Sequence, residues 1–81
     1  MDDPQDEEIV EAGEPFLVAN EFTAVRVCRV RTRNGERLEL VNQRSGARTL
    51  LDPMQLEIIT LQRPEVFSSL LARTLAEPKE V

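Results

Sequence analysis

The chain has 81 residues, a formal net charge of −5, one cysteine and no histidine, tryptophan or tyrosine. This length allows at most one small domain, and one cysteine with no histidine excludes an internal disulfide, a zinc tetrahedron and most nucleophilic active sites. Because small domains without such cross-links are marginally stable, we expect the protein to self-associate or to bind a larger partner.

The first 22 residues carry eight carboxylates and no basic residue, whereas residues 23–48 carry seven arginines. Residues 1–13 contain too little apolar surface to offset the entropy of ordering, so we predict a disordered acidic tail there. The tail either solvates the protein or forms an arm that binds a partner or mimics nucleic acid. An acidic tail beside a basic sheet can also fold back onto it.

The chain shows no pattern typical of export or of membrane insertion. Its start is acidic rather than basic and then apolar, and no apolar run approaches the roughly 20 residues that span a bilayer. A lone thiol suits a reducing compartment. We therefore expect a cytoplasmic protein without a membrane partner.

Residues 14–20 form a compact apolar patch after Pro15. This patch is either a short edge strand or an extended segment that lies on another surface. Phe16 and Phe22 are two of only three aromatic residues, and we expect them to fill the end of a small core.

Residues 24–51 contain two turn signals, at 33–35 and 44–46, between three segments that alternate apolar and charged residues. We predict a three-stranded antiparallel meander with a three-residue loop at each turn, because this register collects the apolar residues. It opposes Arg29 to Glu39. It also places one apolar group on a single sheet face, namely Cys28, Val30, Leu38, Leu40 and Leu50. Cys28 would then be a buried, inert packing group.

Two helices are expected after the meander. Asp52, Pro53 and Gln55 form the N-cap, first-turn proline and capping-box pattern of a helix that ends near residues 62–63. Pro64 opens a second helix, whose apolar residues keep helical spacing, and residues 77–81 resemble a frayed tail. The predicted fold is a small α+β domain over residues 14–76, a three-stranded antiparallel β-meander covered by two short C-terminal helices.

The arginines of the first predicted hairpin are candidate binding residues. Arg29, Arg31 and Arg33 alternate on the face opposite Cys28, and Arg37 is expected to join them from the next strand. Three roles are open for this face: it is a solvated surface, it contacts an acidic protein surface, or it binds the phosphates of a nucleic acid. The lack of aromatic residues for base stacking and the acidic net charge argue against nucleic acid as a partner.

The first predicted helix is apolar on more than one side. We therefore expect Met54, Ile58 and Leu61 to contact a partner. No metal-ligand cluster, phosphate-binding loop or dinucleotide fingerprint is present, so we expect no catalytic residue, cofactor or metal.

Several short motifs resemble a group of short actinobacterial proteins that are often labelled dihydrodiol dehydrogenase and accompany aromatic-ring or related oxygenase genes. The resemblance covers about residues 18–71, and its motifs are Ala19–Phe22, Val25–Val27, Thr32–Gly35, Arg37–Glu39 and Leu51–Glu57. A dinucleotide-dependent dehydrogenase needs a nucleotide site far larger than this chain. The resemblance therefore implies a non-catalytic accessory subunit of a larger oxidative enzyme. The alternative function is that of a nucleic-acid-associated regulator that uses the arginine face.

Overall fold

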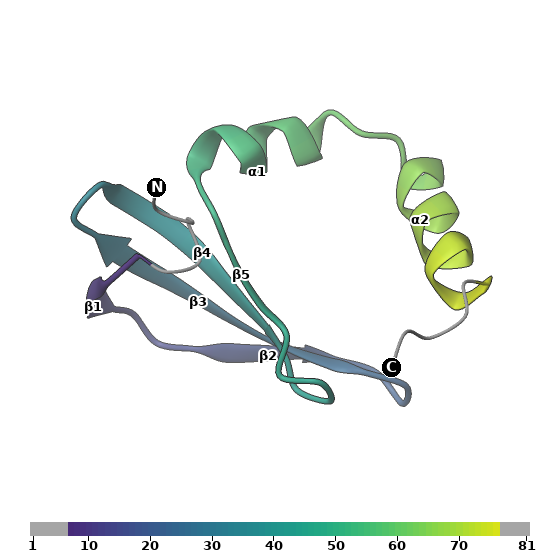
Figure 1. Cartoon of the computed structure of the whole chain (residues 1–81), viewed down its shortest axis with the longest axis horizontal. Coiled ribbons are helices and arrows are strands. Elements are labelled where there is room, and N and C mark those ends of the chain that lie inside the picture. Colours follow the sequence, from purple (N-terminus) through teal and green to yellow (C-terminus); the bar gives the residue numbers. More distant parts are fainter. Residues whose placement is uncertain (1–6, 77–81) are drawn as a thin grey trace.

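The computed structural model describes the backbone of residues 7–76 and the side chains of residues 7–74. It is an α+β fold with an antiparallel five-stranded sheet followed by two helices (Figure 1). The class and the meander are confirmed, and the sheet has two strands beyond the three-stranded meander. One of them, β2, is the short edge strand that was one of the two alternatives for residues 14–20. In chain order the elements are β1 Ile9–Ala12, β2 Phe16–Ala19, β3 Ala24–Thr32, β4 Gly35–Asn42, β5 Arg48–Leu51, α1 Pro53–Thr60 and α2 Pro64–Ala76.

The two additional strands pair with successive parts of β3. β2 pairs with the first half of β3, and β1 pairs with its last residues. Between them the amide of Gly13 donates to the carbonyl of Arg29 at 2.8 Å, and a Cβ on Gly13 would lie only 3.2 Å from that oxygen. Glycine at this position therefore permits the close approach of the two backbones.

The prediction of disorder over residues 1–13 is wrong for β1, whereas residues 1–6 lie outside the described residues. The prediction of disorder failed because it assumed that every carboxylate of this segment is solvated. In the structure Glu7 and Glu11 pair with arginines of the sheet, and Ile9 packs against the core. The expected alternative in which the acidic segment folds back is confirmed for these two carboxylates.

The first hairpin turns through two residues, Arg33 and Asn34. Thr32 pairs with Gly35, whose φ of +124° suits glycine, so the predicted three-residue loop is wrong. The Thr32 hydroxyl accepts from the Asn34 amide and donates to the Gly35 carbonyl, both at 3.1 Å. These local hydrogen bonds stabilise a shorter turn than apolar matching indicated.

The observed register moves β4 by one residue relative to the prediction. Cys28 is opposite Glu39, and Arg29 is opposite Leu38. Because directly opposed residues share a face, Leu38 and Leu40 lie on the other side of the sheet from Cys28. The predicted single apolar face is therefore wrong.

The second turn, in contrast, is longer than predicted. Val41 pairs with Arg48 and Leu40 with Thr49, so the expected pairing of Leu40 with Leu50 is wrong. The side chain of Asn42 accepts from the backbone amides that follow it, and Gly46 has a φ of +80°. These features close a wider loop between β4 and β5.

The core is small and lies on one sheet face. Cys28, Val30 and Leu50 are buried, and Ile9 packs against them. The prediction that Cys28 is a packing group is confirmed, since its side chain is 1% exposed and its thiol donates to the Gly13 carbonyl at 3.4 Å.

Both helices start where the sequence predicts. The Asp52 side chain accepts from the Gln55 amide at 2.8 Å, and the Gln55 side chain accepts from the Asp52 amide at 2.9 Å, which completes the capping box. α1 ends at Thr60, slightly earlier than expected, and α2 begins at Pro64.

The helices do not cover the sheet as predicted. α1 packs against β4, whereas α2 stands away from the strands and makes at most marginal contact with any of them over the described range (Figure 1). The predicted frayed tail, residues 77–81, lies outside the described residues.

Candidate functional site

Three apolar side chains form an exposed line along α1 and its C-cap residue, Leu61. Met54, Ile58 and Leu61 are 74%, 56% and 72% exposed. Their spacing places them along one side of the helix. Leu56, the one half-buried residue of α1, lies on the opposite side of the helix, and α1 contacts β4. The structure thus brings these three predicted residues together as the α1 apolar line.

The predicted arginines do not form one surface. Arg29 and Arg31 are exposed on the face opposite Cys28, as expected, and Arg33 lies exposed in the turn. Arg37 instead shares the face of Val30, because the observed register pairs these two residues. The expectation that Arg37 joins the other arginines on one face is therefore wrong.

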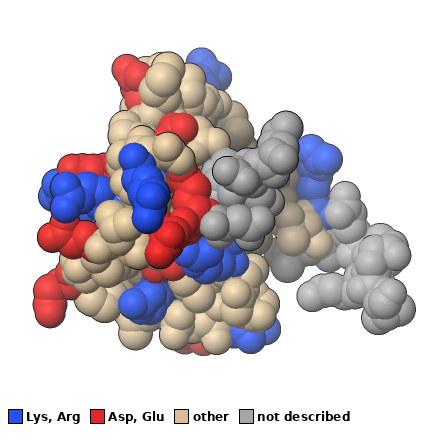
Figure 2. All heavy atoms as spheres, turned by 60° about the vertical axis from the view of Figure 1, so that its left-hand side comes forward, with Lys and Arg blue, Asp and Glu red and all other residues tan. Residues whose placement is uncertain are grey.

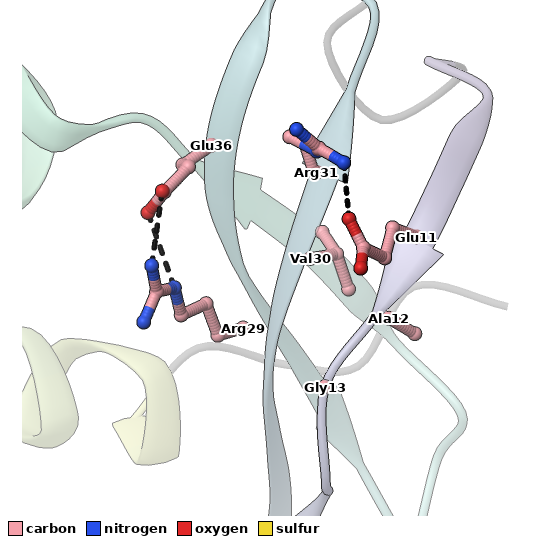
Figure 3. Close-up of a pocket in the computed structure, with 7 residues that line it drawn as sticks. All are labelled: Glu11, Ala12, Gly13, Arg29, Val30, Arg31 and Glu36. Atoms are coloured by element: carbon pink, nitrogen blue, oxygen red, sulfur yellow. Dashed lines mark hydrogen bonds and ion pairs between the residues drawn. The ribbon is translucent and has the colours of Figure 1, made fainter.

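Two of the exposed arginines are neutralised by neighbouring carboxylates. Arg29 forms a bidentate pair with Glu36, at 3.1 and 3.0 Å, and Arg31 pairs with Glu11 of β1 (Figure 3). The hydrogen bonds between Arg29 and Glu36 hold the pKa of the carboxyl below its usual value and raise the pKa of the guanidinium. Both groups are therefore charged and occupied at neutral pH.

Arg37 connects the sheet to the N-terminal segment. Its Nε lies 2.9 Å from one oxygen of Glu7 and its terminal nitrogen 3.2 Å from the other, while the Asn34 side chain donates to Glu7 at 2.7 Å. The hydrogen bond from Asn34 and then those from Arg37 lower the pKa of Glu7. Since only 14% of the Arg37 side chain is exposed, this residue has a structural role.

A buried carboxylate, that of Glu39, lies on the same sheet face as Arg37. Glu39 lies 3.3 Å from Arg26 and 2.6 Å from Arg48, and its side chain is 10% exposed. A charge this deeply placed is stable only with such partners. Sequence reasoning paired Glu39 with Arg29 and missed this network, because a register error of one residue moves the carboxylate to the other face.

A pocket of about 320 Å³ lies between β1, β3 and β4 (Figure 3). It is lined by Glu11, Ala12, Gly13, Arg29, Val30, Arg31 and Glu36. Its four charged side chains form the two ion pairs described above, so the ionised Glu36 is an acceptor and not a proton donor at neutral pH. The pocket offers no unpaired acid, base or nucleophile.

The surface of this part of the molecule carries mixed charge. In Figure 2 acidic and basic side chains lie next to one another, without a continuous basic stripe on the visible face. Among residues 7–76 no cluster of three or more histidine, cysteine or carboxylate side chains could hold a metal ion. No helix within the described range has the length and apolar character needed to cross a membrane.

The fold and its surfaces define a small α+β protein whose core is minor and whose exposed apolar surface is extensive. Comparisons with protein-family models, with curated proteins and with solved structures find no match.

Proposed function

We propose that this protein is a non-catalytic accessory subunit that binds a larger enzyme and stabilises or modulates it. The observation that carries this proposal is the α1 apolar line, in which Met54, Ile58 and Leu61 are all more than half exposed. Exposed apolar residues that gather on one side of an element are typical of a protein interface. A few well-packed residues at the centre of an interface carry most of its affinity.

The chemistry of the side chains and the resemblance both indicate the type of partner. The chain has no histidine or tyrosine, and its one thiol is buried, which supports a subunit that leaves the reaction to its partner. The motifs between residues 18 and 71 resemble proteins that accompany oxygenase genes. This resemblance supports an oxidative, oxygenase-type enzyme as the partner.

The arginines contribute little to this interface in our proposal. Arg29 and Arg31 are held by carboxylates, and Arg37 is turned toward Glu7. Arg33 is the arginine of this group that has no ion pair within residues 7–76, so it is the one available at the rim. Rim charges affect mainly the rate of association.

The proposal is tested by purifying the tagged full-length protein from its native host and identifying the proteins that remain bound through size-exclusion chromatography. We expect a larger enzyme subunit with the wild type and its loss with Ile58→Asp, because a carboxylate in an apolar contact must be desolvated. Val10→Asp is the matched control, since Val10 is also an aliphatic residue about half exposed, but on β1. A complex that survives Ile58→Asp, or a wild type that retains no larger protein, would contradict the proposal.

A further inference from the structure

A second apolar surface lies on the sheet, away from the α1 apolar line. The pairing of β2, β3, β4 and β5 places seven apolar residues on the face opposite Cys28. We call them the apolar sheet face: Phe16, Val18, Val25, Val27, Leu38, Leu40 and Leu51. Phe16 and Val18 are more than half exposed, and the other five are half-buried. This face thus resembles a core surface that lacks a cover.

The helices bend toward this side of the sheet without closing on it. In Figure 3 the side chains of Arg29 and Glu36, which share the apolar sheet face, project to the side of the sheet on which the green and yellow helix ribbons lie. α1 reaches β4, whereas α2 has no substantial contact with a strand among the described elements. The apolar sheet face is therefore open beyond α1.

α2 carries an uncovered apolar stripe of its own. Val66, Phe67, Leu70 and Leu71 recur with helical spacing and are 40%, 44%, 50% and 60% exposed. The helix has charged residues only near its two ends, Glu65 and Arg73, so its two central turns are uncharged. Such a stripe matches an apolar sheet face in polarity. The helix is about 20 Å long for its 13 residues, and the stripe itself advances about 8 Å along it, which spans two neighbouring strands.

The exposed area is larger than a monomer of this size requires. The chain exposes 6940 Å² for a mass of 9.2 kDa, whereas a compact monomer exposes about 4900 Å². Residues outside the described range can account for at most about 1900 Å², and a compact monomer of the remaining mass exposes about 4400 Å². The surplus of about 600 Å² is close to the roughly 800 Å² that each partner contributes to a standard interface.

We propose that a second copy of this chain covers the apolar sheet face with its α2, and that the exchange is reciprocal. Each chain then provides one helix stripe and one sheet face, so two contacts close a symmetric dimer without leaving either surface exposed. Only residues 61–63 connect α1 to α2, and a short connection that holds a helix off its own sheet favours such an exchange. This dimer uses neither Met54 nor Ile58, so it is independent of the proposed function.

The first test measures the mass of the full-length wild type by light scattering across a dilution series. We expect about 18 kDa, twice the 9.2 kDa of one chain, with dissociation on dilution. A mass of one chain at every concentration would overturn the proposal. It would mean that α2 is free, packs on its own sheet or binds a different protein.

The second test separates exchange of α2 from any other dimer. Leu70→Asp alters the stripe and Val18→Asp alters the sheet face, and each should weaken self-association by about 30-fold or more, as expected for an interface anchor. Mixing the two variants creates a pair in which one unaltered α2 meets one unaltered sheet face. We therefore expect the mixture to associate more tightly than either variant alone.

Ile58→Asp is the control, because it alters the α1 apolar line and should leave the dimer intact. Circular dichroism establishes that each variant is folded. If Leu70→Asp remains a folded dimer, or if mixing two folded variants restores nothing, the exchange is excluded. If the variants unfold, the dilution series of the wild type still decides whether a second copy is bound.

Discussion

At the scale of single residues, carboxylates from the N-terminal part of the chain determine what the arginines can do. Glu7 and Glu11 each pair with an arginine of the sheet, at Arg37 and Arg31. The same residues that give the chain its acidic start therefore remove two arginines from the surface available to ligands. Charge that appears segregated along the sequence is neutralised in space.

Glu7 should make folding stability depend on pH. Its pKa in the folded protein is below the usual 4.5, because Asn34 and Arg37 donate to its carboxylate. A lowered carboxyl pKa adds stability above the unfolded-state pKa, and this stability is lost as the pH falls through the folded-state pKa. We expect Glu7→Gln to unfold at lower urea concentration than the wild type at neutral pH, with a difference that shrinks in acid.

The control for this prediction is Glu8→Gln, which neutralises the adjacent, exposed carboxylate. Urea midpoints measured from neutral to acidic pH should leave that variant close to the wild type throughout. Equal effects of the two substitutions, or a Glu7→Gln difference that does not change with pH, would contradict a specific contribution of Glu7.

At the scale of the elements, the sequence predicted the features that depend on residues close together in the chain. It did not predict those that depend on contacts between distant residues. The capping box of α1 and the start of α2 follow from side chains a few residues apart, and both were predicted correctly. The register of β4 depends on which face holds Glu39. That choice depends on Arg26 and Arg48, which contact this carboxylate from the neighbouring strands. Apolar matching favoured one continuous core, whereas the chain divides its apolar residues between two faces.

The formation of β1 could not be predicted for the same reason, because it depends on contacts with residues distant in the sequence. Nothing in its composition reveals that Ile9 reaches the core or that the Gly13 carbonyl accepts from Cys28. The apolar residues exposed on α1 were identified because helical spacing is a local property. The open sheet face was not, because it depends on the register.

β1 should control access to Cys28. Ile9→Ala removes part of a half-buried side chain from the core, which we expect to cost about 1 to 2 kcal/mol. If the lost stability lowers the free energy of local opening of β1, the population of molecules with β1 open rises by about tenfold. The rate at which a thiol reagent modifies Cys28 in the folded protein should increase accordingly. Val10→Ala, on the exposed side of the strand, should leave the modification rate nearly unchanged. If both variants are modified at the same rate, β1 does not protect Cys28.

At the scale of the whole molecule, two apolar surfaces on different sides suggest an assembly with two kinds of contact. The α1 apolar line is proposed to meet a larger enzyme, and the apolar sheet face is proposed to meet α2 of a second copy. Because the two surfaces share no residue, one assembly can contain both contacts. An accessory subunit of this design would present two α1 lines related by the dimer axis.

The distribution of charge predicts weak binding to nucleic acid. Arg29, Arg31 and Arg37 are paired with carboxylates, and the net charge is −5, so few counterions would be released from phosphates. By fluorescence anisotropy at low salt we expect mixed-sequence single-stranded and duplex DNA to bind more weakly than about 10⁻⁴ M, the weak end of ordinary non-specific affinity. A double variant, Glu11→Gln with Glu36→Gln, frees two arginines and should bind more tightly than the wild type. Tight, salt-dependent binding by the wild type would instead support the regulator that uses the arginine face.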